Sequence, residues 1–128
     1  MTSEKFSIIK RIKSFSHAFR GLVVLLKEQH NARIHLVAAI IVTFMGFFFS
    51  INAAEWITVV IAIALVISAE LINSSVEYLC DVVTKDHHPG IRDAKDMAAA
   101  AVLIVSIGAA VAGGIIFIPY ILNYLNDV

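Results

Sequence analysis

The sequence predicts an all-α integral membrane protein, in which one amphipathic surface helix precedes three transmembrane helices. The first observation is the composition: 59% of the 128 residues are hydrophobic, 16% are charged, and the mean hydropathy is +0.86. A soluble domain has an apolar share of only about 45–50%. The second is a set of three long apolar runs, and the third is an apolar stripe at helical spacing ahead of them. We expect a single membrane domain over residues 1–128.

The surface helix is predicted over about residues 6–28. Its apolar residues recur at alternating steps of four and three, which keeps them on one stripe of a helix: Ile8, Ile12, Phe15, Phe19, Leu22 and Leu26. The opposite side carries Lys10, Lys13, His17, Arg20, Lys27 and Glu28. Such a helix is suited to lie in the headgroup plane, with its apolar stripe in lipid and its cations near anionic headgroups. The alternative is that it serves only as an anchor.

The three transmembrane helices are predicted at about residues 34–51, 56–80 and 97–122. Crossing the hydrocarbon core takes about 20 helical residues, and each run approaches or exceeds that length. The third run contains "AAAAV" and "GAAVAGG". Small residues of this kind let other helices approach closely, so the third span is expected to pack against partners.

The cations are distributed unequally between the two sides of the predicted spans. Seven precede the first span (Lys5, Lys10, Arg11, Lys13, Arg20, Lys27 and Arg33), and three follow the second (Lys85, Arg92 and Lys95). Cytoplasmic loops carry an excess of Lys and Arg. We therefore expect the N-terminus and the 82–96 loop in the cytoplasm and the C-terminus outside. The formal net charge is zero, and no basic field indicates a nucleic-acid partner.

The stretch "AELINSSVEYLCD" places polar residues inside the second apolar run. Glu70, Asn73, Glu77 and Asp81 share one helical face, because at ~100° per residue they lie within about 60° of Glu70. A buried carboxylate is costly in a membrane and marks a functional site by default. Three interpretations remain open: carboxylates that reach water or pair with basic loop residues at the interface, ion or proton translocation, and a metal-assisted enzyme. In the enzyme, one carboxylate would hold Mg²⁺ and another would act as general base.

The stretch "TKDHHPGIRDAKDMAA" forms a polar connection to the third span. Pro89-Gly90 signals a turn, and Asp93 is the expected N-cap of the helix that follows. Lys95 and Asp96 lie at the same interface as the polar end of the second span, which allows one shared polar site. No Walker loop and no GxGxxG motif occur in the sequence, so the familiar nucleotide-binding folds are excluded.

The motif "ELINSSVEYLCD", followed about a dozen residues later by "AKDMAAAAVL", closely resembles the signature of the prokaryotic diacylglycerol kinase family. That family includes the undecaprenol kinases. The resemblance extends from "FSHAFRGL" to the end of the third span, and so covers nearly the whole chain. It implies an ATP-dependent lipid kinase of the bacterial inner membrane. Each chain would have a surface helix and three transmembrane helices, and a homotrimer would form composite sites between protomers.

The resemblance also implies roles for individual residues. Glu70 would be the catalytic base that takes the proton from the lipid hydroxyl, Asn73 would orient the site, and Ala99 would border the lipid. Glu77 would hold the cofactor Mg²⁺ on the nucleotide phosphates. The residues implied in nucleotide binding are Lys10, His17, Gln29, Glu77, Asp86, His87, His88, Lys95 and Asp96.

One position departs from the family pattern. The family commonly has a metal-binding glutamate four residues before the position of Arg33, where this sequence has Gln29. We assign Glu28, one residue earlier, as the second metal ligand and keep Gln29 as the alternative contact. "HNARIHL" and the loop sequence look more like the undecaprenol branch than the diacylglycerol branch. The competing function is a small oligomeric ion-coupled transporter, but its polar residues would be expected near the bilayer midplane.

Overall fold

The computed structural model describes residues 6–128, which form four helices and no strand. They are α1 (Ile8–Glu28), α2 (His30–Phe48), α3 (Ala53–Val83) and α4 (Pro89–Asp127). Over the described residues, α2, α3 and α4 are long and apolar enough to cross a membrane. The prediction of an all-α membrane protein is confirmed. Lys5, one of the cations used to predict orientation, lies outside the described residues.

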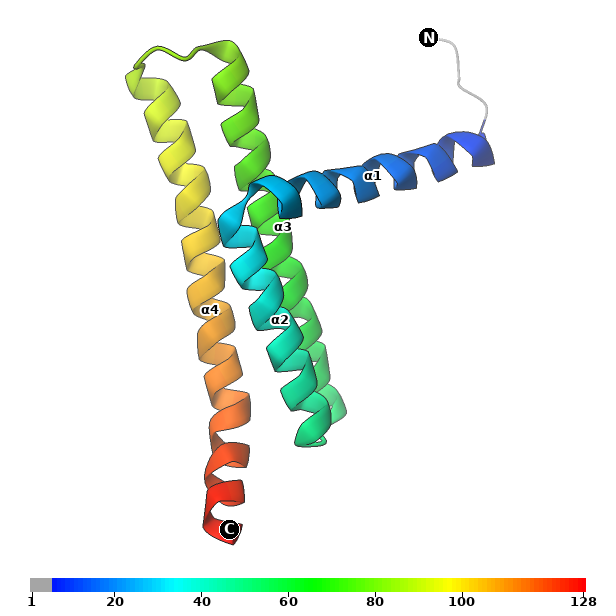
Figure 1. Cartoon of the computed structure of the whole chain (residues 1–128), viewed down its shortest axis with the longest axis vertical. Coiled ribbons are helices and arrows are strands. Elements are labelled where there is room, and N and C mark those ends of the chain that lie inside the picture. The colour runs from blue at the N-terminus through cyan, green and yellow to red at the C-terminus, as the bar shows by residue number, and fades with distance from the viewer. Residues whose placement is uncertain (1–5) are drawn as a thin grey trace.

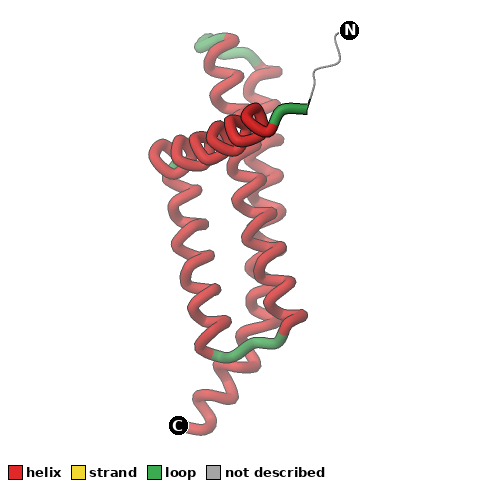
Figure 2. Tube along the Cα trace, turned by 90° about the vertical axis from the view of Figure 1, so that its right-hand side faces the viewer, coloured by secondary structure: helices red, strands yellow, loops and turns green. Residues whose placement is uncertain are grey.

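The three long helices form a bundle, from which α1 projects sideways (Figure 1). Both α2 and α4 pack against α3, and the end of α1 contacts α2 and α3. The α1–α2 corner and the α3–α4 connection lie toward one end of the bundle, and the α2–α3 connection lies at the other (Figures 1 and 2). We call the first the site end. The second is the aromatic end, where Phe47, Phe48, Phe49, Trp56, Phe117, Tyr120 and Tyr124 form ring contacts.

The surface helix keeps its apolar stripe exposed. Ile12, Phe15 and Phe19 have exposed fractions of 63%, 68% and 66%. No other element covers this stripe within residues 6–128, because α1 contacts the bundle only near its C-terminal end (Figure 1). Lipid at the headgroup boundary would bury it, as the amphipathic pattern predicts.

A single residue separates α1 from α2. Gln29 is extended, with φ −104° and ψ 111°, and its N–H donates to the Leu25 carbonyl at 2.9 Å. The Arg33 side chain folds back from α2 and donates from Nε to the Leu26 carbonyl at 2.8 Å and from its guanidinium to the Lys27 carbonyl. A cation on the last carbonyls of a helix also complements the helix dipole. Arg33 therefore stabilises the corner that aims α1 away from the bundle.

The aromatic end holds the main hydrophobic core. Ile51, Val59, Ile116 and Phe117 are buried there, and partly buried side chains such as Trp56 pack around them. Glycine at position 46 makes room for the Trp56 ring, since a Cβ on Gly46 would lie 2.6 Å from Trp56 Cη2.

The α2–α3 connection is tightly built. Ser50 has a positive φ of 52°, which turns the chain, and Asn52 then caps α3. The Asn52 side chain accepts from the Glu55 N–H, and the Glu55 carboxylate accepts from the Asn52 N–H, both at 2.9 Å. Glu55 also accepts a hydrogen bond from Tyr120 Oη at 2.8 Å. One carboxylate thus joins the start of α3 to α4.

The structure corrects the predicted 82–96 loop, because only residues 84–88 lie outside the helices. The helix α3 continues to Val83 and α4 begins at Pro89. The N-cap is His88, whose Nδ1 accepts from the Gly90 N–H at 3.1 Å, so the prediction that Asp93 caps this helix is wrong. Proline suits the first position of a helix, where its missing N–H costs nothing. The Pro-Gly pair therefore starts α4, and Asp93 lies inside its first turns.

Candidate active site

Glu70 is a buried carboxylate among the three long helices. It lies on α3 with an exposed fraction of 2%. Its Oε1 is 3.2 Å from Nε2 of His35 on α2, yet no residue among 6–128, His35 included, gives Oε1 an aligned hydrogen bond. Native proteins rarely leave a buried polar atom without a partner, and such atoms often mark functional positions. Glu70 is therefore a candidate functional residue.

Two further polar side chains near Glu70 carry unpartnered oxygens. Asn73 Oδ1 and Ser74 Oγ are both inaccessible to solvent and accept or donate no hydrogen bond within the described residues. They follow Glu70 within about one helical turn of α3. This part of α3 therefore offers several unmatched hydrogen-bonding groups in a small region, which a substrate or a second chain could satisfy.

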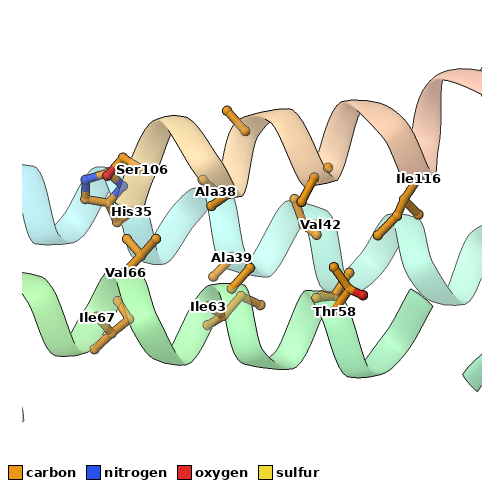
Figure 3. Close-up of a pocket in the computed structure, with 16 residues that line it drawn as sticks. His35, Ala38, Ala39, Val42, Thr58, Ile63, Val66, Ile67, Ser106 and Ile116 are labelled. Atoms are coloured by element: carbon orange, nitrogen blue, oxygen red, sulfur yellow. The ribbon is translucent and has the colours of Figure 1, made fainter. Parts of the chain in front are cut away.

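An apolar cavity of about 310 Å³ lies between α2, α3 and α4 (Figure 3). Its walls are mostly Ala, Val and Ile side chains, and His35 and Ser106 form a polar patch at one end. Val66, one turn of α3 before Glu70, lines the same cavity. The cavity therefore extends from the His35–Glu70 contact toward Ile116, into the membrane-spanning part of the bundle.

A second polar group lies where α1 meets α3. The hydroxyl of Tyr78 donates to the Glu28 carboxylate, which brings the last residue of α1 beside the neighbour of Glu77. Glu77 itself is partly buried. Gln29, the alternative to Glu28, forms the corner between α1 and α2. Of the two candidates, Glu28 is the one whose side chain forms a hydrogen bond with α3 within residues 6–128.

The ends of α3 and α4 are joined by an ion pair. Lys95 Nζ lies 2.6 Å from Asp81 Oδ1, so the predicted nucleotide contact Lys95 sits beside the polar end of α3. Asp96 is exposed on the same stretch of α4. Asp86, His87 and His88 occupy the 84–88 connection immediately beyond, and His88 also caps α4.

Other predicted site residues are not brought together within one chain. Lys10 and His17 lie in the part of α1 that projects away from the bundle (Figure 1). Ala99 is exposed on α4, and the exposed fractions of the surrounding apolar side chains are high. These three positions would need another chain, the nucleotide or lipid to connect them with Glu70.

Residues 6–128 contain no cluster of three or more His, Cys, Asp or Glu side chains suited to hold a metal by themselves. Mg²⁺ is usually bound by one or two carboxylates together with substrate phosphates, not by a cage built from protein alone. Glu77 on α3 and Glu28 on α1 are hard oxygen donors, and Glu28 accepts a hydrogen bond from Tyr78, the residue that follows Glu77. This donor set fits a metal that arrives with the nucleotide.

The sequence profile of the prokaryotic diacylglycerol kinase family matches residues 16–117. This stretch runs from the surface helix to the buried Phe117 and includes Glu70, Asn73, Glu77 and Lys95. The chain belongs to this family. It is therefore a lipid kinase, which confirms the function and the resemblance predicted from the sequence.

Individual relatives agree with the assignment. Undecaprenol kinase of Bacillus subtilis (strain 168) is 36% identical over 107 residues, covering 84% of this chain and 87% of that protein. Diacylglycerol kinase of Synechocystis is 30% identical over 113 residues, covering 88% of this chain and 65% of that protein. Diacylglycerol kinase of Escherichia coli (strain K12) is 25% identical over 111 residues, covering 87% and 91%.

Sequence reasoning missed two side chains of the site. His35 lies five residues into α2, where the pattern shows only the start of an apolar run. Tyr78 lies one residue beyond Glu77, and its bond to Glu28 joins residues 50 positions apart. A histidine at the edge of a membrane span was the available signal for the first, since ionisable groups there are costly. Nothing in the local pattern distinguishes Tyr78.

Proposed function

We propose that this lipid kinase transfers the γ-phosphate of ATP to the hydroxyl of undecaprenol in preference to diacylglycerol. The observation that carries the proposal is Glu70, a buried carboxylate in contact with His35, which lines the polar end of an apolar cavity. A lipid alcohol has matching chemistry, because its hydroxyl can meet the carboxylate while its tail stays among apolar side chains. Undecaprenol is favoured by the "HNARIHL" stretch and by the similarity to the Bacillus subtilis enzyme.

The residues of α3 would divide the work of phosphoryl transfer. The carboxylate of Glu70 takes the proton of the lipid hydroxyl as the hydroxyl oxygen forms a bond to the γ-phosphorus. The bond between that phosphorus and the bridging oxygen breaks, and ADP leaves with the electron pair. Asn73 would orient the reacting groups through its amide, whose oxygen is buried and unpartnered. The proton on Glu70 returns to solvent before the next turnover.

The nucleotide would bind at the site end, between α1 and the ends of α3 and α4. Glu77 and Glu28 would hold Mg²⁺, which when bound neutralises charge on the phosphate oxygens. Glu70 and Glu77 are seven residues apart, which is about 10 Å along a helix, so a triphosphate chain could extend between them. Lys95 would contact the phosphates, and this requires exchanging its bond to Asp81 for one to the nucleotide.

The remaining nucleotide contacts would come from segments on both sides of α3. Asp96 and the 84–88 connection, with Asp86, His87 and His88, lie at the end of the hairpin. Lys10, His17 and Gln29 would approach from α1. Because the outer part of α1 extends away from its own bundle, contacts by Lys10 and His17 would be made most directly across a boundary between protomers.

We also propose a homotrimer in the bacterial inner membrane, with the N-terminus in the cytoplasm and the C-terminus outside. The positive-inside rule supports the orientation, since the described cations lie in α1, at Arg33 near the start of α2, and between Lys85 and Lys95 around the start of α4. The unpartnered Asn73 and Ser74 oxygens and the exposed small residues of α4, including Ala99, support association. Nothing in residues 6–128 or in the comparisons supports the transporter alternative.

The test is a kinase assay on the purified chain in detergent micelles with labelled ATP, using undecaprenol and diacylglycerol side by side. Glu70→Gln should lower kcat by about a thousandfold or more, since it removes the base while keeping shape and size. Asp127→Asn is the matched control, because Asp127 is an exposed carboxylate at the far end of α4. Full activity of Glu70→Gln would reject this residue as the base, and a higher kcat/KM for diacylglycerol would reject the acceptor preference.

A further inference from the structure

We infer that His35 positions Glu70 for proton transfer, by donating its Nε2–H to the Glu70 carboxylate. The inference rests on the proposed role of Glu70 as the base and adds a residue on a different helix. His35 lies on α2 and Glu70 on α3, and their Nε2 and Oε1 atoms are 3.2 Å apart. Within residues 6–128, no other Lys, Arg or His nitrogen lies within 4.0 Å of this carboxylate.

The burial of Glu70 makes such a donor necessary. The exposed fraction of its side chain is 3%, so water provides little solvation of the charge. A carboxylate removed from water is strongly disfavoured unless it is paired or hydrogen-bonded. Within residues 6–128, Ser74 Oγ makes no hydrogen bond, and Glu70 Oε1 accepts none from Asn73. His35 is the group that can keep an ionised Glu70 inside the bundle.

The geometry indicates a contact that tightens when substrate binds. The present distance is that of an ion pair, but the N–H does not point at the oxygen closely enough for a hydrogen bond. Catalytic hydrogen bonds in enzymes without substrate are often long or poorly aligned and shorten in the reacting complex. A rotation of the imidazole ring would align Nε2–H with Oε1 without moving either helix.

The position of His35 also decides where the carboxylate points. His35 lines the apolar cavity, where it shares the polar end with Ser106 (Figure 3). A bond from His35 would hold one Glu70 oxygen at this end of the cavity and leave the other oxygen for the lipid hydroxyl. A base held by a second residue in this way recurs in many enzymes, where the second residue fixes orientation and does not itself take the substrate proton.

The test compares substitutions that keep or remove the N–H at the place of Nε2. His35→Gln keeps an amide N–H at nearly that place, so its kcat should stay within about threefold of wild type. His35→Leu fills the apolar wall but removes the donor, and should lower kcat by about ten- to hundredfold with KM for ATP and lipid unchanged. His35→Asn keeps a polar amide that is one bond too short, and should resemble His35→Leu. His30→Leu, at an exposed histidine of the same helix, should behave as wild type.

A packing role predicts the opposite order, with His35→Leu at least as active as His35→Gln, and that result would overturn the inference. Should His35→Leu not fold, as judged by circular dichroism and gel filtration, the comparison of Asn with Gln decides between the two roles. In the Glu70→Gln background, His35→Leu should cause no further loss, because residues that act as a unit are not additive. A further loss of ten- to hundredfold there would contradict action through Glu70.

Different results would overturn the proposed function and the role of His35. A wild-type protein that phosphorylates neither undecaprenol nor diacylglycerol would overturn the proposed function and the inference that rests on it. A wild-type protein that is active, with a His35→Leu variant equally active, would overturn only the role of His35.

Discussion

Arg33→Met should loosen the corner between α1 and α2. The guanidinium donates to the carbonyls of Leu26 and Lys27, and methionine keeps the length of the side chain while removing both donors. Hydrogen bonds to charged groups contribute about 1.5–3 kcal/mol each, but Arg33 is exposed and solvent competes for the same carbonyls. We therefore expect about 1 kcal/mol per bond and about 2 kcal/mol in total, which is roughly thirtyfold in the local opening equilibrium.

The assay is hydrogen exchange at the amides that close the corner. The Gln29 N–H, which donates to the Leu25 carbonyl, should exchange about thirtyfold faster in Arg33→Met, with no change at the aromatic end. Arg33→Lys keeps the charge but replaces the planar fork by one ammonium, so an intermediate increase of about fivefold is expected. Arg20→Met, at an exposed cation inside α1, is the matched control. Equal exchange in Arg33→Met and Arg20→Met would refute the role assigned to Arg33.

Three further substitutions test the aromatic end through the midpoint of thermal unfolding. Gly46→Ala places a methyl group 2.6 Å from the Trp56 ring and should cost about 1–3 kcal/mol. Ser50→Val puts a β-branched side chain at a φ of 52° and should cost about 1–2 kcal/mol. Tyr120→Phe removes the 2.8 Å bond to Glu55 and should cost about 1–2 kcal/mol while the cap of α3 survives.

Each of these substitutions has a control in the same chain. Gly108→Ala adds the same methyl group where no atom lies within 4 Å, and it should not lower the midpoint. Ser50→Gly tolerates the positive φ and should be more stable than Ser50→Val. Tyr124→Phe removes a hydroxyl from an exposed ring of the same cluster and should be neutral. If Gly46→Ala and Gly108→Ala had equal effects, the close approach of Trp56 would not explain the glycine.

The three long helices were predictable from the sequence because their apolar runs approach or exceed the length needed to cross a bilayer. Their ends were not, and α4 shows why. The sequence places the third span at 97–122, whereas the helix runs from Pro89 to Asp127. Hydropathy detects only the apolar segment that can lie in the hydrocarbon core. The helix continues beyond this segment at both ends through turns with polar residues. Pro89 is ambiguous for the same reason, since proline ends some helices and starts others.

Some residues of the candidate site could also be predicted from the sequence, and others could not. Glu70, Asn73 and Glu77 could be placed on one helical face because spacing along a helix fixes angle. No comparable spacing rule predicts which residues of two different helices come into contact. The approach of His35 to Glu70 depends on how α2 packs against α3, and the bond from Tyr78 to Glu28 depends on a turn made at one extended residue, Gln29. Local periodicity determines neither.

The interactions that hold the helices together differ between the two ends of the bundle. At the aromatic end a buried core, a capping box and the Tyr120–Glu55 bond join all three long helices. At the site end the side-chain bonds between helices are exposed, as in the Lys95–Asp81 pair and the Tyr78–Glu28 bond. Thermal motion should therefore separate α2 from α3 more easily toward the site end than among the aromatic rings, because α2 packs less extensively on α3 than α4 does. A long-chain alcohol could then enter sideways from the bilayer between helices, without any part of the fold having to unfold.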